Sequence, residues 1–195
     1  AGNEAISQAV SGSPIINIPD AEGKIVFSQT PNSWTNQDVT VTMQGPSEYT
    51  IEYSVDGGNY QDYKSTGVVM SQNGTIKARL KIGSVIGKET SYIVNKIDKL
   101  PPNGFTPKVQ ATTSTLTVIA DAVDQPATST NGSSGIRGYK YSKDDGKTWT
   151  EEKSSNTYTF TGLEQGQTCQ IKVIAIDNAG NETISSVAQG TTTKI

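Results

Sequence analysis

The stretch 75–82 alternates between apolar and charged residues more regularly than any other part of the chain. Its apolar members recur at every second position, and its charged members lie between them: Ile76, Ala78, Leu80 and Ile82 against Lys77, Arg79 and Lys81. Successive side chains of a β-strand point to opposite faces, so this pattern places one face in a core and the other in water. The pattern predicts a half-buried strand.

The same period recurs along the chain and predicts an all-β fold. Val39, Val41 and Met43 share one face, as do Leu116, Val118 and Ala120. The chain has 25 threonines and four leucines, which favours sheets over helices because threonine suits the exposed face of a strand. We expect further strands at 24–28, 50–54, 90–94, 138–142, 157–160, 170–176 and 184–187.

The composition and the position of two adjacent prolines predict two small sandwiches instead of one thick core. Apolar residues are 33% and charged residues 18% of the chain, which suits thin cores. Pro101 and Pro102 favour an extended connection between the halves. The expected organisation is an N-terminal linker at 1–23 with a short helical turn around 4–10, a sandwich at 24–97, an inter-domain linker at 98–103, a second sandwich at 104–190 and a tail at 191–195.

The two halves share landmarks in the same order. Residues 53–58 match 141–146, residues 75–77 correspond to 170–172, and residues 87–90 align with 180–183. The match indicates two versions of one sandwich plan, and tandem sandwiches serve as spacers.

The second half resembles a fibronectin type III domain. Ile136, Gly138-Tyr139 and Tyr141 are similar to the third strand of that family, and 161–169 and 171–181 to its later corner and strand. Cys169 stands where the family has its corner tyrosine, so the resemblance implies that the hydrogen bond from the tyrosine hydroxyl to the backbone is absent. Ala120 stands where the family has a core tryptophan.

The first half resembles the Ig-like repeats of Gram-positive surface proteins. Residues 31–36 followed by 39–41 are similar to their opening strand, and 95–99 with Pro101 to their junctions. The resemblance implies display at the cell surface, in adhesins or glycan-acting enzymes.

The segment 142–149 resembles the Asp-box of sialidase propellers. A sialidase-like site needs three arginines to hold a carboxylate, whereas this chain has Arg79 and Arg137 alone. We therefore interpret the segment as a structural turn in which an aspartate accepts backbone N–H bonds above a packed tryptophan. The residues of this turn are Ser142, Asp144, Gly146 and Trp149.

Residue types that usually carry catalysis are scarce. Histidine is absent, and Cys169 is expected to be a small buried hydrophobe. Glu151 and Glu152 are adjacent, so a strand would point them to opposite faces. We predict no enzyme activity and no catalytic residue. The net charge of −3 argues against nucleic acid as a partner, and no stretch has transmembrane length.

Two kinds of ligand contact remain open. Calcium is one: either Asp177-Asn178 with Asn181-Glu182 or Asp98 offers hard oxygen ligands, although such residues also form plain turns. No other cofactor is expected. The other is stacking on a sugar by Tyr60, Tyr63 or Trp149, which competes with packing inside the sandwiches.

These observations favour a non-catalytic extracellular stalk or interaction module of a bacterial surface or adhesin-like protein. The alternative is a set of carbohydrate-binding or spacer domains of a larger secreted glycan-acting enzyme. The single cysteine excludes an intrachain disulfide; this resembles exported Gram-positive proteins, which commonly avoid disulfides, but would also fit a cytosolic protein. The repeated Thr-, Asn- and Gly-rich β pattern favours export. We expect a monomer whose partner is a host or cell-surface protein or a glycan, without insertion of this segment into a membrane. Because the chain opens on Ala1, we also expect an upstream signal or anchor.

Overall fold

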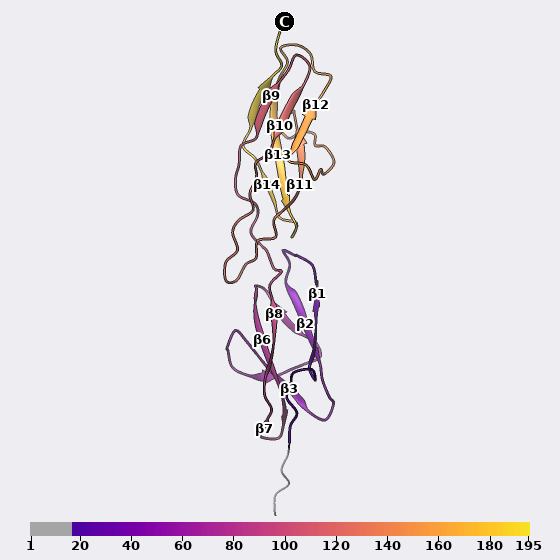
Figure 1. Ribbon diagram of the computed structural model, residues 1–195, viewed down its shortest axis with the longest axis vertical. Helices are drawn as coiled ribbons and strands as arrows, with labels where there is room; N and C mark the ends of the chain where they lie inside the picture. The colour runs from indigo at the N-terminus through magenta and orange to yellow at the C-terminus, as the bar shows by residue number, and fades with distance from the viewer. Residues whose placement is uncertain (1–16) are drawn as a thin grey trace, which may run out of the picture.

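The computed structural model describes residues 17–195, and all regular secondary structure in this range is β. The predicted all-β class is confirmed, whereas the turn expected around 4–10 lies outside the described residues. No helix in the described range is long and apolar enough to cross a membrane. Figure 1 shows two β-sandwiches stacked end to end in an elongated molecule.

The first sandwich packs a three-stranded sheet, β1-β2-β5, against a five-stranded sheet. In the larger sheet, β4, β3 and β6 lie in that order, and β7 and β8 both pair with β6. All pairings are antiparallel. The strands are β1 (Val26–Thr30), β2 (Val39–Gln44), β3 (Thr50–Val55), β4 (Gln61–Asp62), β5 (Val68–Met70), β6 (Gly74–Ile82), β7 (Val85–Ile86) and β8 (Thr90–Val94).

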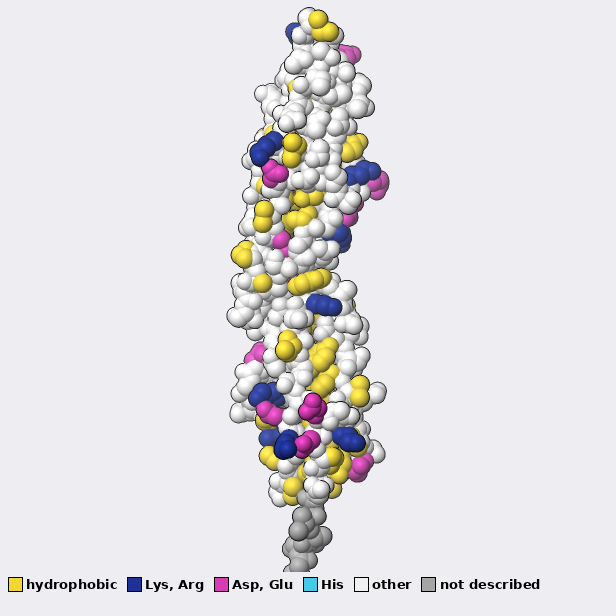
Figure 2. Space-filling model, in the orientation of Figure 1, with side chains coloured by type: hydrophobic (Ala, Val, Ile, Leu, Met, Phe, Trp, Pro, Cys, Tyr) yellow, Lys and Arg dark blue, Asp and Glu magenta, His cyan; other side chains and the backbone are white. Residues whose placement is uncertain are grey.

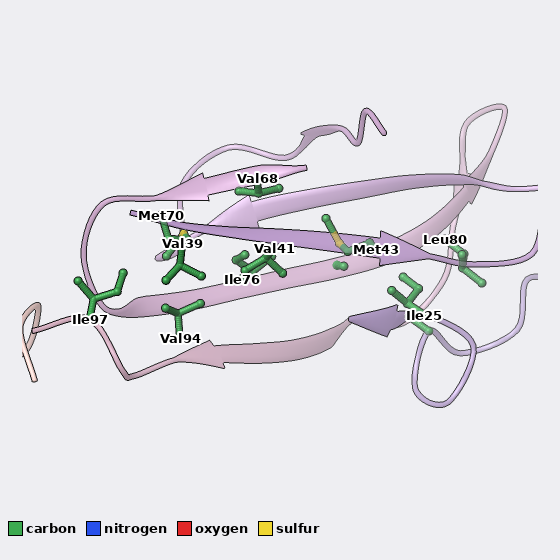
Figure 3. Close-up of a cluster of buried hydrophobic side chains, with 12 residues drawn as sticks. Ile25, Val39, Val41, Met43, Val68, Met70, Ile76, Leu80, Val94 and Ile97 are labelled. Carbon is green, nitrogen blue, oxygen red and sulfur yellow. The ribbon is translucent and has the colours of Figure 1, made fainter. Parts of the chain in front are cut away.

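Alternation along β2 and β6 supplies the core of this sandwich. Val39 and Val41 are fully buried, and Ile76 faces them from the other sheet (Figure 3). Burying a side chain of this size stabilises the fold by roughly 1.5–3 kcal/mol. Ile82, expected on the same face, is 38% exposed because it ends β6 at the β7 turn.

The second sandwich repeats this plan with sheets β9-β10-β12 and β11-β13-β14, and β15 also pairs with β13. Leu116, Val118 and Ala120 are fully buried, as their alternation predicts. Tyr141 is buried as well, and its hydroxyl donates to the Ser155 carbonyl over 2.8 Å. The strands are β9 (Lys108–Ala111), β10 (Leu116–Ile119), β11 (Ile136–Ser142), β12 (Thr157–Phe160), β13 (Thr168–Asp177), β14 (Glu182–Ile184) and β15 (Ala188–Thr191).

The strand predicted at 184–187 is wrong, because the chain breaks there into β14 and β15. Ser185 causes the break: its hydroxyl accepts from the Val173 N–H over 2.9 Å, and the next N–H, of Ser186, donates to the Phe105 carbonyl. The last strand therefore leaves β13 and rejoins it further along.

The shared plan extends to strand register at the matched hairpins. Ser54 pairs with Lys77 in the first sandwich, as Ser142 does with Lys172 in the second. Beyond this pair the second hairpin has one additional residue. The Asp56 N–H donates to the Thr75 carbonyl in the first sandwich, whereas in the second the Asp145 N–H donates to the Gln170 carbonyl.

Both ends of the described chain pack more closely than a linker and a tail would. Ala21, inside the predicted linker, is fully buried in the first core, and its N–H donates to the Lys88 carbonyl. Thr192, in the predicted tail, is 2% exposed and donates to the Glu164 carbonyl. Neither segment alternates, so periodicity did not reveal its burial.

Candidate functional site

The two tyrosines predicted as ligand contacts belong to the first sandwich and are engaged there. The hydroxyl of Tyr60 donates to Glu89, and the Arg79 guanidinium lies 3.7 Å from its ring centroid. The Tyr63 hydroxyl accepts from the Met43 N–H over 3.0 Å, and its ring packs against the core. One face of Tyr60 is thus covered, and Tyr63 is a packing residue.

Ion pairs surround Tyr60 on this sheet. The Glu52 carboxylate is nearly buried and binds Lys81 at 2.5 Å and Arg79 at 2.8 Å. The Lys81 hydrogen bond, with help from Arg79, lowers the pKa of Glu52. Figure 2 shows acidic and basic side chains side by side on the first sandwich. This network braces the sheet and leaves Glu52 unsuited to accept a proton.

The segment 142–149 forms a closed turn. Asp144 Oδ1 accepts from the Ser142 hydroxyl at 2.7 Å and from the Thr148 N–H at 2.9 Å, and Oδ2 accepts from the Thr148 hydroxyl at 2.5 Å. The Thr148 bonds first, then the Ser142 bond, hold the pKa of Asp144 well below its usual range. Gly146 has φ 85° and lies against the Trp149 ring. These contacts close the segment into a hydrogen-bonded turn, and its purely structural role stays a prediction.

The predicted acid pair is separated by its contacts. Glu152 binds the Arg137 guanidinium at 2.9 and 3.3 Å, which lowers the pKa of Glu152, while Glu151 is exposed. Glu152 is thus committed to an ion pair with Arg137, and the two acids have different surroundings.

The connecting segment is hydrogen-bonded to residues that lie far away in the sequence. Ile97 is fully buried; its N–H donates to Asn73 Oδ1 over 2.8 Å and its carbonyl accepts from Asn73 Nδ2 over 3.0 Å. The same carbonyl accepts the Gly132 N–H over 2.7 Å. One peptide group therefore joins the first sandwich to a loop of the second.

That loop, 124–135, is rich in serine, threonine and glycine, yet it reaches into the junction. Asn131 Oδ1 accepts the Lys99 N–H at 2.7 Å, and its Nδ2 donates to Asp98 at 2.9 Å. The Thr130 carbonyl accepts the Asn73 N–H at 2.8 Å. A loop with no regular pattern thus positions the two sandwiches.

The turn after β13 holds the connecting segment from another side. Asn181 Nδ2 donates to the carbonyls of Asp98 at 2.8 Å and Leu100 at 3.3 Å. The Thr183 hydroxyl donates to the Pro102 carbonyl at 2.5 Å. The predicted linker at 98–103 is consequently clamped and does not act as a free tether.

Three carboxylates meet inside this junction. Asp98, Asp124 and Asp177 each present an oxygen, and these oxygens lie within 4.8 Å of one another. Asp98 and Asp177 are 1% and 0% exposed. Burial raises the pKa of Asp177, with a further contribution from the charge of Asp98. Across residues 17–195, no lysine or arginine forms a salt bridge with these three groups.

The carboxylates are held by hydrogen-bond donors instead. The donors are the Leu100 and Ser134 N–H groups and Asn131 Nδ2 for Asp98, the Gln125 and Gly135 N–H groups and the Ser133 hydroxyl for Asp124, and the Asn181 N–H and Nδ2 for Asp177. Hard oxygen ligands of this kind suit calcium, and the sequence prediction of calcium stays a prediction.

The structure changes the predicted ligand set. It brings Asp98 and Asp177, which were alternatives, into one cluster and adds Asp124, which sequence reasoning missed. Asn178 and Asn181 use their amide nitrogens as donors to neighbouring oxygens, and Glu182 lies 3.8 Å from the Lys140 amine. These last three residues therefore serve the junction and the sheet.

Known proteins resemble this chain in fold. A crystal structure of titin domains superposes with a TM-score of 0.52 at 15% identity, over 88% of this chain and 66% of that one. The fold is a tandem of two Ig-like and fibronectin type III-like β-sandwiches. The chicken CNTN1 FN1–FN3 domains give a TM-score of 0.40 at 16% identity, over 83% and 65% of the chains.

Similarity in sequence to the tandem is narrower. No protein-family model matches it. Exoglucanase B of Cellulomonas fimi is 33% identical over 122 residues, which is 62% of the tandem. The tandem spans 11% of the length of that curated relative.

Proposed function

We propose that the tandem is a rigid, non-catalytic extracellular spacer within a larger secreted glycan-acting protein, where it fixes the distance between neighbouring parts. The observation behind this proposal is the clamped connecting segment: Ile97 and Asp98 are each hydrogen-bonded by residues of both sandwiches, and Leu100 is held by Asn181 of the second. Bonds of this kind suppress rotation between domains, which is otherwise the default for linked domains.

The similarity to Exoglucanase B favours the accessory role over an adhesin stalk. The matched segment is a small part of that protein, as expected for a module that accompanies a catalytic region. The contacts of Glu52, Asp144 and Glu152 support a non-catalytic role, because each carboxylate is already bound by side chains of its own sandwich. We further propose that the module acts as a monomer outside the cell.

Small-angle scattering and NMR relaxation of the whole chain test the spacer. The wild type is expected to tumble as one elongated body. Asn73→Ala leaves the buried Ile97 N–H without an acceptor, at a cost of about 1–3 kcal/mol, and is expected to broaden the distribution of domain orientations. Asn156→Ala, an exposed substitution in the second sandwich, is the matched control and is expected to change nothing. Independent tumbling of the two sandwiches in the wild type would overturn the proposal.

A further inference from the structure

A cleft opens beside the clamped segment, between the two sandwiches. Its volume is about 380 Å³, which falls within the roughly 300–1,000 Å³ typical of ligand sites. Trp34 and Ile93 contribute from the first sandwich, and the loop residues Thr128, Ser129 and Gly132 close it from the second. Ligand sites commonly form at such domain boundaries.

Trp34 has a fixed place in this cleft. It precedes Thr35, whose N–H donates to the Lys96 carbonyl and whose own carbonyl accepts the Asp98 N–H. A Cβ at Gly132 would lie 2.8 Å from Trp34 Cη2, so the loop can approach the ring only because it has glycine there. The indole is held by the junction, yet Trp34 stays partly exposed.

The lining of the cleft is uncharged. None of its 13 described lining residues is acidic or basic, although 18% of the chain is charged. Ile93 is 64% exposed and adds aliphatic surface beside the indole. The amides of Asn73 and Asn131 are engaged with the junction backbone, which leaves Thr75, Asn95 and Ser129 to offer hydroxyl and amide groups to a ligand.

We infer that this cleft binds a neutral saccharide, with a sugar ring stacked on Trp34 and its hydroxyls bonded to Asn95, Thr75 and Ser129. A sugar ring combines an apolar face with a polar edge, which matches an aromatic and aliphatic wall bordered by amides and hydroxyls. An ionic ligand would find no counter-charge in the lining. The inference rests on the fixed junction of the proposed spacer for the shape of the cleft, and on its accessory role for the choice of probes.

Fluorescence of the full chain tests the site, since Trp34 and Trp149 are its two tryptophans. In Trp149→Phe, Trp34 is the sole reporter, and cellohexaose or xylohexaose is expected to shift its emission to the blue. In Trp34→Phe, Trp149 reports from outside the cleft and is expected to stay unchanged. Hexagalacturonic acid, which is charged, is expected to bind weakly or not at all.

The saccharide affinity of single-residue variants tests which side chains contact the sugar. Asn95→Ala, at an exposed position, is expected to weaken binding about tenfold, which corresponds to the loss of a good polar contact. Asn156→Ala is the matched control and is expected to bind as the wild type does. Trp34→Ala is expected to abolish binding; should it fail to fold, Ser129→Ala with Asn95→Ala still tests the site.

Two results would overturn the inference: no change in Trp34 emission with millimolar neutral hexasaccharide, or unaltered affinity in both Asn95→Ala and Ser129→Ala. Either result leaves the spacer intact, because rigidity is measured without sugar. Independent tumbling of the two sandwiches in the wild type would overturn the spacer and the sugar site together, because the cleft is lined by residues of both.

Discussion

The second sandwich contains two aspartates whose surroundings shift their pKa values in opposite directions. Asp144, in the outer hairpin, is surrounded by donors from Thr148 and Ser142, and its pKa lies well below its usual range. Asp177, at the junction, is fully buried beside Asp98, and its pKa is raised. Hydrogen-bond donors around the partly buried Asp144 favour its charged form and lower its pKa, whereas burial of Asp177 next to another carboxylate disfavours the charged form and raises its pKa.

The comparison separates a local feature from a long-range one. The bonds of Asp144 stay within a few residues of it, while Asp177 shares its cluster with Asp98 and Asp124, which come from the connecting segment and a distant loop. Changes at the hairpin are therefore expected to affect the second sandwich alone. Changes at the junction are expected to affect how the two sandwiches are joined.

The largest effect at the hairpin is expected from Trp149→Ala. The indole lies against Gly146 of the turn and lines a hollow with Tyr141 and Phe160, so its removal strips apolar contacts from this side of the sandwich. We expect a loss of about 2–4 kcal/mol in the unfolding free energy of the second sandwich. Denaturant unfolding followed by circular dichroism measures it. Trp149→Phe, which keeps an aromatic ring, is expected to lose less; equal stability of Trp149→Ala and wild type would show that the turn needs no packed indole.

A smaller effect is expected at the junction from calcium. If the three carboxylates bind it with the dissociation constants of about 10⁻⁴–10⁻³ M common in extracellular modules, then about 10 mM calcium stabilises the fold by roughly 1–3 kcal/mol. Thermal unfolding with calcium and with chelator measures the shift. Asp124→Asn is expected to reduce it and Asp144→Asn to preserve it.

Protonation gives this experiment a second check. The raised pKa of Asp177 means that protons compete with calcium as the pH falls, so the calcium-induced rise in melting temperature is expected to shrink in acid. A melting temperature that calcium and chelator leave unchanged at neutral pH would show that the cluster is a hydrogen-bonded turn alone.

Sequence reasoning found the features that depend on neighbours along the chain. Alternation at 75–82 predicts β6, because a strand's two faces follow directly from its residue order. The spacing of Ser142, Asp144 and Trp149 likewise indicates a turn, since the side-chain bonds of Asp144 go to residues two and four positions away. The short strand β5 was not predicted, because three residues cannot show a period.

Sequence reasoning missed features that depend on distant residues meeting. Asn131 and Asp98 are 33 positions apart, and nothing in the serine- and threonine-rich loop indicates that it reaches the connecting segment. Asp124 and Trp34 were overlooked for the same reason: the cluster and the cleft exist only once the two sandwiches are stacked.

The smallest effect expected is the pH dependence of Asp144. Its folded pKa lies below the unfolded value of about 3.9, so the ionised group stabilises the fold above that pH and loses this contribution as the pH falls through the folded pKa. Asp144→Asn is therefore expected to be less stable than wild type at neutral pH, with a difference that narrows below about pH 4. Asp177 acts with the opposite sign, because its raised pKa makes the fold relatively more stable as protons bind. It is present in both chains and cancels in the difference.

Asp145→Asn, which removes an exposed ion pair to Lys172, is the neighbouring control. If the difference in unfolding free energy between the wild type and Asp144→Asn stays constant from neutral to acid pH, the turn holds Asp144 through its shape and not through its charge.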